Sequence, residues 1–156
     1  MRKITLLTFS IFSIYLFSSC IARNMTFGNG KDWIPADFDA KNTILLIETN
    51  DPMKQADKKM LAYMREKYPY RFECVSHKTI MDKEGKYADV SLYRYSLINT
   101  YYTINSMTFG RPSVGAQDFC FYDRSNGKKY PSTGKGSSGK VMTFKPVINT
   151  IVKNVK

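Results

Sequence analysis

The sequence predicts an α+β fold, a two-layer sandwich in which a mixed sheet of about four to five strands is covered by two main helices. Three observations support this prediction. A strand pattern, an amphipathic helix and a second strand follow one another between residues 43 and 75. Two further strand patterns, the second followed by Asn126-Gly127, predict antiparallel pairing. A second helical pattern then ends the chain at residues 143–155.

The first half of the domain reads as a strand, a helix and a strand. Residues 43–48 (Thr-Ile-Leu-Leu-Ile-Glu) are a short apolar run, typical of a buried strand. Residues 52–68 place apolar side chains three and four positions apart, which predicts a helix that Pro69 ends. Residues 71–75 form the second strand. This order predicts a parallel pair joined by a right-handed crossover.

The middle of the chain predicts a central strand and a hairpin. Residues 76–91 are polar and predict a loop with one helical turn. Residues 92–104 form the longest strand pattern, and both of its faces are apolar, as in a strand covered on two sides. Residues 105–116 predict a long loop, and residues 118–123 predict another strand. Asn126-Gly127 is a strong hairpin signal.

The C-terminal element is an amphipathic helix. Residues 131–139 are rich in glycine and serine and predict a loop. Thr143 is a suitable N-cap for a helix over residues 143–155, and Pro146 then falls in its first turn, where proline is tolerated. We expect one domain over residues 43–156, preceded by a tether over residues 20–42, which shows neither a helical nor an alternating period.

The first nineteen residues have the layout of a secretory signal peptide. Arg2 and Lys3 are followed by a mostly apolar run that is too short for a span of about 20 residues. Ser18 and Ser19 then precede Cys20. This arrangement resembles the signal of bacterial lipoproteins, with Phe17 standing where such signals usually have leucine. The resemblance implies cleavage before Cys20, lipid attachment to its thiol (palmitate among the acyl chains) and an outer-membrane anchor facing the periplasm.

The charge balance favours anionic partners. The chain carries a formal charge of +11, which falls to +9 when Arg2 and Lys3 leave with the signal peptide. An exported protein does not meet nucleic acid, so acidic lipid headgroups and anionic envelope glycans are the fitting candidates. The alternative is that the lysines only solvate the surface, because they are scattered along the sequence rather than gathered in one run.

The remaining cysteines and the single histidine do not indicate a metal site or a catalytic site. Cys74 and Cys120 lie in predicted strands, so they could form a disulfide in an oxidising compartment or be small buried residues. With His77 as the only histidine, these residues lack the short ligand spacing of a zinc site, and we expect neither a metal nor a cofactor. We interpret His77 as a solvated loop residue.

One glycine-rich segment resembles a phosphate-binding loop. Gly134, Gly139 and Lys140 have the spacing of a P-loop, but Val141 stands where the motif needs a Ser or Thr hydroxyl for magnesium. Nucleotide hydrolysis is therefore not expected. A weaker hypothesis remains, an anion site made of Gly134, Lys135, Gly136 and Lys140, with an ordinary turn as the alternative.

Other catalytic patterns are incomplete. Two Ser-x-x-Lys matches lie in residues 132–140, but the partner motifs of penicillin-binding enzymes do not occur in the chain. The chain also has no nucleophile elbow that would make His77 the base of a serine triad. Nine tyrosines between residues 68 and 130, with arginines such as Arg71 and Arg94 interleaved, either form a binding face or fill the core.

The sequence as a whole resembles a small envelope lipoprotein. We expect a non-catalytic, membrane-anchored module that binds a protein or an anionic envelope polymer, and we do not expect an enzyme. Two other functions remain open. A lipid or lipopolysaccharide carrier would need an apolar cavity between sheet and helices, and a small periplasmic hydrolase would need a polar cleft at His77 or at a carboxylate pair.

Overall fold

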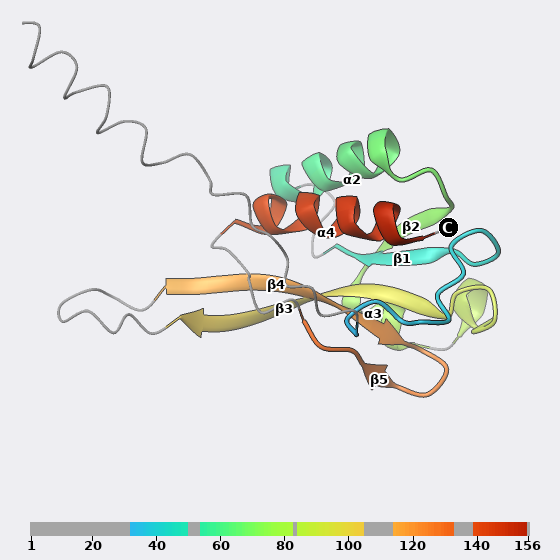
Figure 1. The fold of residues 1–156 in the computed structure, drawn as a ribbon. Helices are drawn as coiled ribbons and strands as arrows, with labels where there is room; N and C mark the ends of the chain where they lie inside the picture. Colours follow the sequence, from blue (N-terminus) through green and yellow to red (C-terminus); the bar gives the residue numbers. More distant parts are fainter. Residues whose placement is uncertain (1–31, 50–53, 83, 105–113, 133–138, 156) are drawn as a thin grey trace, which may run out of the picture.

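A five-stranded mixed sheet with two long helices on one face forms the domain, which confirms the predicted α+β fold (Figure 1). The structure is a computed structural model and describes residues 32–49, 54–82, 84–104, 114–132 and 139–155. Its strands are β1 (Leu45–Glu48), β2 (Phe72–Val75), β3 (Tyr95–Ile104), β4 (Val114–Asp123) and β5 (Lys128–Lys129). Its helices are α2 (Gln55–Lys67), α3 (His77–Met81) and α4 (Lys140–Asn154), with a 3-10 turn, η2, at Gly85–Tyr87.

The strands lie in the order β2-β1-β3-β4-β5. The predicted parallel pairing of β1 with β2 is confirmed, and β1 also pairs in parallel with β3. The strand β3 pairs antiparallel with β4 along ten residues, and β4 pairs antiparallel with β5 through the turn that Gly127, at φ +76°, completes. The predicted central strand is therefore in the centre of the sheet.

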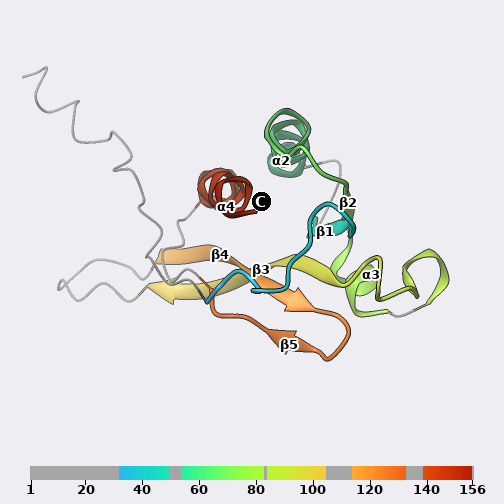
Figure 2. The same ribbon diagram turned by 45° about the vertical axis from the view of Figure 1, so that its right-hand side comes forward.

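The two crossover connections cover opposite faces of the sheet. From β1 the chain crosses to β2 on one side, and from β2 it returns to β3 on the other side of β1. Right-handed crossovers that move in opposite directions place their helices on opposite faces. Accordingly α2 lies with α4 on one face, and the short α3 lies on the other (Figure 2).

Each face has its own hydrophobic core. On the helical face, residues from α2, α4 and alternate positions of β1, β3 and β4 are almost fully buried, among them Met60, Leu97, Phe119, Phe144 and Ile148. On the opposite face a smaller cluster contains Leu46, Val75, Ile80, Tyr93 and Cys120. The alternation follows from the strand period of two, which turns successive side chains to opposite faces.

Part of the segment that we assigned to a tether belongs to the domain. Trp33 is 5% exposed and Ala40 is 1% exposed, and both lie in the core cluster of the helical face. The ring of Phe38 lies 5.1 Å from that of Phe121. Residues 32–42 therefore pack against the sheet, and any tether is restricted to the residues before them.

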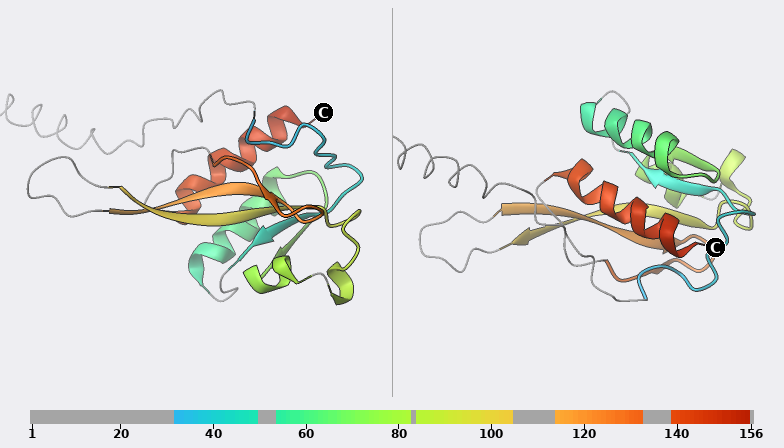
Figure 3. Two further views of the ribbon diagram at one scale, coloured as in Figure 1. Left: turned by 90° about the horizontal axis from the view of Figure 1, so that it is seen from below. Right: turned by 45° about the horizontal axis from the view of Figure 1, so that its top comes forward.

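Several element boundaries differ from the sequence prediction, most of all the starts of α4 and β4. The helix α4 begins at Lys140, so Thr143 is not its N-cap but a buried residue of its first turn, where its hydroxyl donates to the carbonyl oxygen of Gln117. Pro146 consequently lies inside the helix. The strand β4 begins at Val114, four residues before the predicted start, because it pairs with β3 as far as Ile104. Both longer strands extend together beyond the rest of the sheet (Figure 3).

Candidate functional site

The solvent-exposed sides of the two long helices carry most of the net charge of the domain. Seven exposed cations lie on α2, on α4 and at Lys54, the residue before α2, and Glu66 is their only exposed carboxylate. The cations are Lys54, Lys58, Lys59, Arg65, Lys67, Lys145 and Lys153. Their net charge of +6 is two thirds of the +9 of residues 20–156. Lysines that are far apart in the sequence therefore lie together on the two helices in the folded domain. We call this surface the basic helical face.

A groove runs between the first turns of α2 and α4 within the basic helical face. Its volume is about 540 Å³. Lys59, Lys140 and Lys145 line it together with Gln55, Ala56, Gly139, Val141 and Met142, and no carboxylate is among the lining residues. Lys145 also lies over the ring of Tyr63, with Nζ 5.2 Å from the ring centroid. The groove therefore presents two exposed ammonium groups beside apolar surface.

Lys140, a member of the predicted anion site, forms an ion pair inside the domain. Its Nζ lies 2.6 Å from Oδ1 of Asp57, and both side chains are buried. Gly134, Lys135 and Gly136 lie outside the described residues, so the complete anion site stays a prediction. The sequence analysis missed Asp57, although its spacing from Met60 and Met64 places it on the buried face of α2.

A second polar cluster lies at the carboxyl ends of the parallel strands. Glu48 ends β1 and is 5% exposed. Its Oε2 accepts a hydrogen bond of 2.9 Å from the backbone N–H of Asn99, and its Oε1 lies 3.3 Å from Nδ1 of His77. His77 begins α3, and its side chain is 55% exposed. The carboxylate of Glu48 thus accepts the hydrogen bond of a β3 backbone N–H at the point where β1 ends. The same carboxylate also contacts the imidazole of His77.

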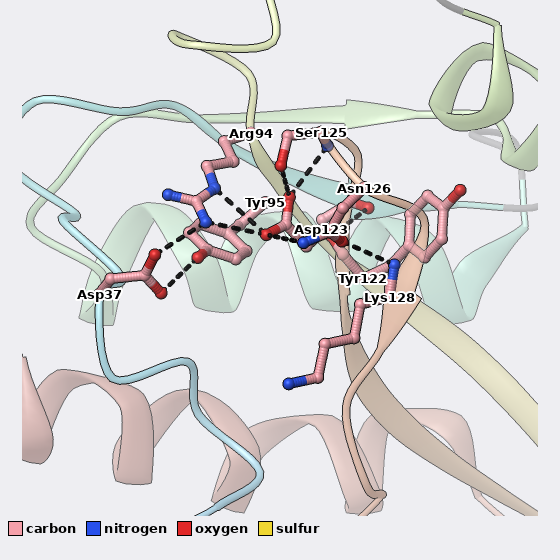
Figure 4. A network of polar contacts seen from close by, with 9 residues as sticks. Asp37, Arg94, Tyr95, Tyr122, Asp123, Ser125, Asn126 and Lys128 are labelled. Carbon is pink, nitrogen blue, oxygen red and sulfur yellow. Dashed lines mark hydrogen bonds and ion pairs between the residues drawn. The ribbon is translucent and has the colours of Figure 1, made fainter.

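Two tyrosines at the start of the central strand are buried, whereas Tyr101, further along β3, is 64% exposed. Tyr93 and Tyr95 are 5% and 1% exposed, one on each face of the sheet. Arg94, between them, is bound to Asp37 and Asp123 (Figure 4). Core packing is therefore confirmed for Tyr93 and Tyr95, whereas a binding role for the exposed Tyr101 stays a prediction.

The Arg94 cluster joins the N-terminal segment to the sheet. Arg94 Nη2 lies 2.7 Å from Asp37 and 3.0 Å from Asp123, and the hydroxyl of Tyr95 donates to Asp37 over 2.5 Å (Figure 4). The hydrogen bond from Tyr95 and the charge of Arg94 lower the pKa of Asp37. Burial alone would raise the pKa of Asp123, but hydrogen bonds from Arg94 and Ser125 outweigh it, so this pKa is lowered too. We interpret the cluster as a structural clamp.

A buried arginine holds the connection that covers the smaller core. Arg124 is fully buried, and its guanidinium donates to the carbonyl oxygens of Ile80, Asp82, Tyr87 and Tyr93 over 2.8 to 3.0 Å. Burial lowers the pKa of this guanidinium. The four bonds link the end of β4 to residues 80–93. Nothing in the local pattern at residue 124 distinguishes it from a solvated arginine, so sequence reasoning missed it.

The two cysteines are free thiols and are not joined to each other. Cys74 lies on β2 and Cys120 on β4, with β1 and β3 between these strands. Strands in a sheet are about 4.8 Å apart, so the two residues are separated by about 14 Å, beyond the reach of a disulfide. Of the two alternatives for these cysteines, the disulfide is therefore wrong. Burial raises the pKa of each thiol to about 11.

Among the described residues, the almost fully buried side chains of the larger core pack between the sheet and the two long helices. None of the helices in the described residues is long and apolar enough to cross a membrane. Residues 1–19 and Cys20, which carry the resemblance to lipoproteins, lie outside the described part of the chain.

Comparison of the chain with protein families, with curated proteins and with solved structures finds no match.

Proposed function

We propose that this protein is a lipid-anchored, non-catalytic envelope module that binds an anionic glycan polymer with its basic helical face. The observation that carries the proposal is the asymmetry of charge, because the exposed sides of α2 and α4, with Lys54, carry seven cations and one carboxylate. Clustered charge of one sign raises the local concentration of a polymer of the opposite sign and speeds its association.

The groove supports a polymer rather than a flat lipid surface as the ligand. It lies between two helices, has a volume of about 540 Å³ and is lined by Lys59 and Lys145. A segment of a glycan chain would fit such a groove, whereas a layer of headgroups would contact only its rims. The open ammonium groups would pair with carboxylates or phosphates of the polymer, and the apolar lining would contact its sugar rings.

The anchor rests on the resemblance of residues 1–20 to lipoprotein signals and is tested by mass. Intact mass spectrometry of the protein from native membranes should show a chain that lacks residues 1–19 and carries acyl groups on Cys20. A mass without acyl groups would overturn the anchor. The glycan proposal would then stand or fall on its own test.

The glycan proposal is tested with a pair of matched charge-reversal variants. Lys59→Glu with Lys145→Glu changes the groove, whereas Lys128→Glu with Lys129→Glu makes the same change of charge on β5. We expect the mature protein to bind polygalacturonate and not neutral dextran. The groove variant should bind polygalacturonate at least tenfold more weakly than the wild type, and the β5 variant should lose much less affinity.

The salt dependence and a lipid probe separate the alternatives. Binding to polygalacturonate should weaken as salt rises, because exposed charges are screened. Equal loss in both double variants would show that only net charge matters and would overturn the assigned face. Binding to vesicles that contain phosphatidylglycerol, without binding to polygalacturonate, would replace the glycan with the membrane surface as the ligand.

A further inference from the structure

The strand β2 is an open edge of the sheet. The backbone N–H groups of Leu45 and Thr49 donate to the carbonyl oxygens of Arg71 and Val75 over 3.1 and 2.8 Å. In a parallel pair, alternate residues of a strand point their backbone groups toward the partner strand. Phe72 and Cys74 therefore direct their N–H and C=O groups away from β1. Within the described residues, no backbone group bonds to them there.

A cavity lies beside the C-terminal half of this open edge, at Cys74 and Val75. It has a volume of about 390 Å³ and is bounded by β2 itself, by α2 on one side and by α3 with η2 on the other. Leu61, Cys74 and Tyr87 contribute apolar surface, and Ser76 and Thr79 contribute hydroxyl groups. The cavity therefore combines unpaired backbone groups with pockets for side chains. An extended peptide needs both of these to add a strand to a sheet.

The charges at the cavity favour an acidic occupant. Asp57 and Lys58 are the charged residues of its lining. The carboxylate of Asp57 is paired with Lys140, whereas Lys58 is exposed and makes no ion pair with any described residue. Arg65 also lies close enough to Cys74 to oppose the rise in the pKa of its thiol that burial causes. The unmatched charge beside β2 is therefore positive.

We propose that β2 is a docking site for an extended segment of a partner protein, which adds as a sixth strand and places an acidic side chain near Lys58. Phe72 and Cys74 supply two N–H and two C=O groups for this pairing. With a rise of about 3.3 Å per residue, the four residues of β2 would hold a segment of about four to six residues. This protein-binding site is separate from the groove of the basic helical face, since the two cavities share no lining residue.

The test uses peptides selected on the mature chain. A phage-displayed library of linear octapeptides is panned against the protein in detergent and counter-selected on Cys74→Pro, which removes the outward N–H of β2. Cys74→Val is the matched control, because it keeps that N–H and changes only the side chain. We expect enriched peptides that contain an acidic residue and bind Cys74→Pro at least tenfold more weakly than Cys74→Val.

Amide hydrogen exchange identifies the place of binding. An enriched peptide should slow exchange at Phe72 and Cys74 and leave Glu73 and Val75, which already face β1, little changed. The peptide has two alternating sets of backbone N–H groups, and only one set would face β2. N-methylation of that set should reduce the affinity at least tenfold, whereas N-methylation of the other set should not. This second measurement serves if Cys74→Pro fails to fold. Lys58→Glu should weaken the binding of an acidic peptide and leave the binding of its Glu-to-Gln analogue unaffected.

Three results would overturn the proposal. The first is that no peptide is enriched on the wild type over Cys74→Pro. The second is that an enriched peptide leaves amide exchange at Phe72 and Cys74 unchanged. The third is that protection of these two amides rises with protein concentration in the absence of peptide, which would make a second copy of the chain the occupant. Failure here leaves the binding of polygalacturonate through Lys59 and Lys145 untouched, so the two proposals fail separately.

Discussion

Lys140 Nζ lies 2.6 Å from Asp57 Oδ1, and only 8% and 3% of the two side chains are exposed. The pair connects α2 with the first turn of α4, which begins at Lys140 itself. It lies between the two cavities, since Asp57 lines the one beside β2 and Lys140 lines the groove between the helices. The ion pair therefore fixes the relative position of the helices that form both proposed sites.

Removing one member of this pair should be strongly destabilising. Asp57→Ala leaves the ammonium of Lys140 buried without its carboxylate, and we expect a loss of about 3 to 5 kcal/mol in the free energy of unfolding. Replacing both residues by apolar ones, Asp57→Leu with Lys140→Met, should restore stability to within about 1 kcal/mol of the wild type. Denaturant unfolding of the three variants measures this. A double variant that is as unstable as Asp57→Ala would contradict the expected coupling.

Arg124 should control the stability of the connection between β2 and β3. Arg124→Lys retains one charge but cannot supply N–H groups to four carbonyl oxygens, and each abandoned buried acceptor costs about 1 to 3 kcal/mol. We expect faster amide hydrogen exchange across residues 80–93 and a loss of several kcal/mol in global stability. Lys128→Ala, an exposed change on the neighbouring β5, should stay within about 0.5 kcal/mol of the wild type. Unchanged exchange in Arg124→Lys would contradict the assigned role.

The elements with a clear period were predictable from the sequence. The apolar run of residues 43–48 and the helical spacing over residues 52–68 predicted β1 and α2, because burial on one or two faces imposes those patterns. Asn126-Gly127 predicted the β4–β5 turn, where Gly127 adopts φ +76°. In each case the signal depends on residues that are neighbours in the sequence.

The features that form the candidate sites depend on partners far away in the sequence. Asp57 and Lys140 are 83 positions apart, and Tyr95 and Asp37 are 58 positions apart. No local pattern pairs them. The basic helical face was hidden for the same reason, since the lysines of α2 and the lysines of α4 meet only when both helices pack on one face of the sheet (Figure 2).

The clamp around Arg94 should fail in acid. The folded state lowers the pKa of Asp37 and of Asp123. These groups therefore contribute stability above the pKa of an unfolded aspartate, about 3.9, and the contribution is lost as pH falls through the lower folded values. We expect stability to be insensitive to these groups above about pH 5 and to decline below about pH 4.

Trp33 fluorescence measures this loss, because Trp33 is the only tryptophan and is buried next to Phe121. Its emission should shift to longer wavelength as the clamp opens. Asp37→Asn removes one charge of the clamp and should make the shift less dependent on pH, with a cost near neutral pH of about 1 kcal/mol or less. The same acid response in Asp37→Asn would assign the transition to other carboxylates.

Glu48 and His77 should contribute unequally if the cluster at the end of β1 is structural. Glu48→Ala removes the acceptor for the backbone N–H of Asn99, and we expect a loss of about 1 to 3 kcal/mol, which Glu48→Gln should partly recover. His77→Ala removes a side chain that is 55% exposed and should change stability by about 0.5 kcal/mol or less. Denaturant unfolding compares the three variants. If His77→Ala costs as much as Glu48→Ala, the carboxylate and the imidazole form a strongly coupled pair. Such coupling would show that the exposed imidazole stabilises the end of β1 as strongly as the buried carboxylate does, and would contradict the expected unequal contributions.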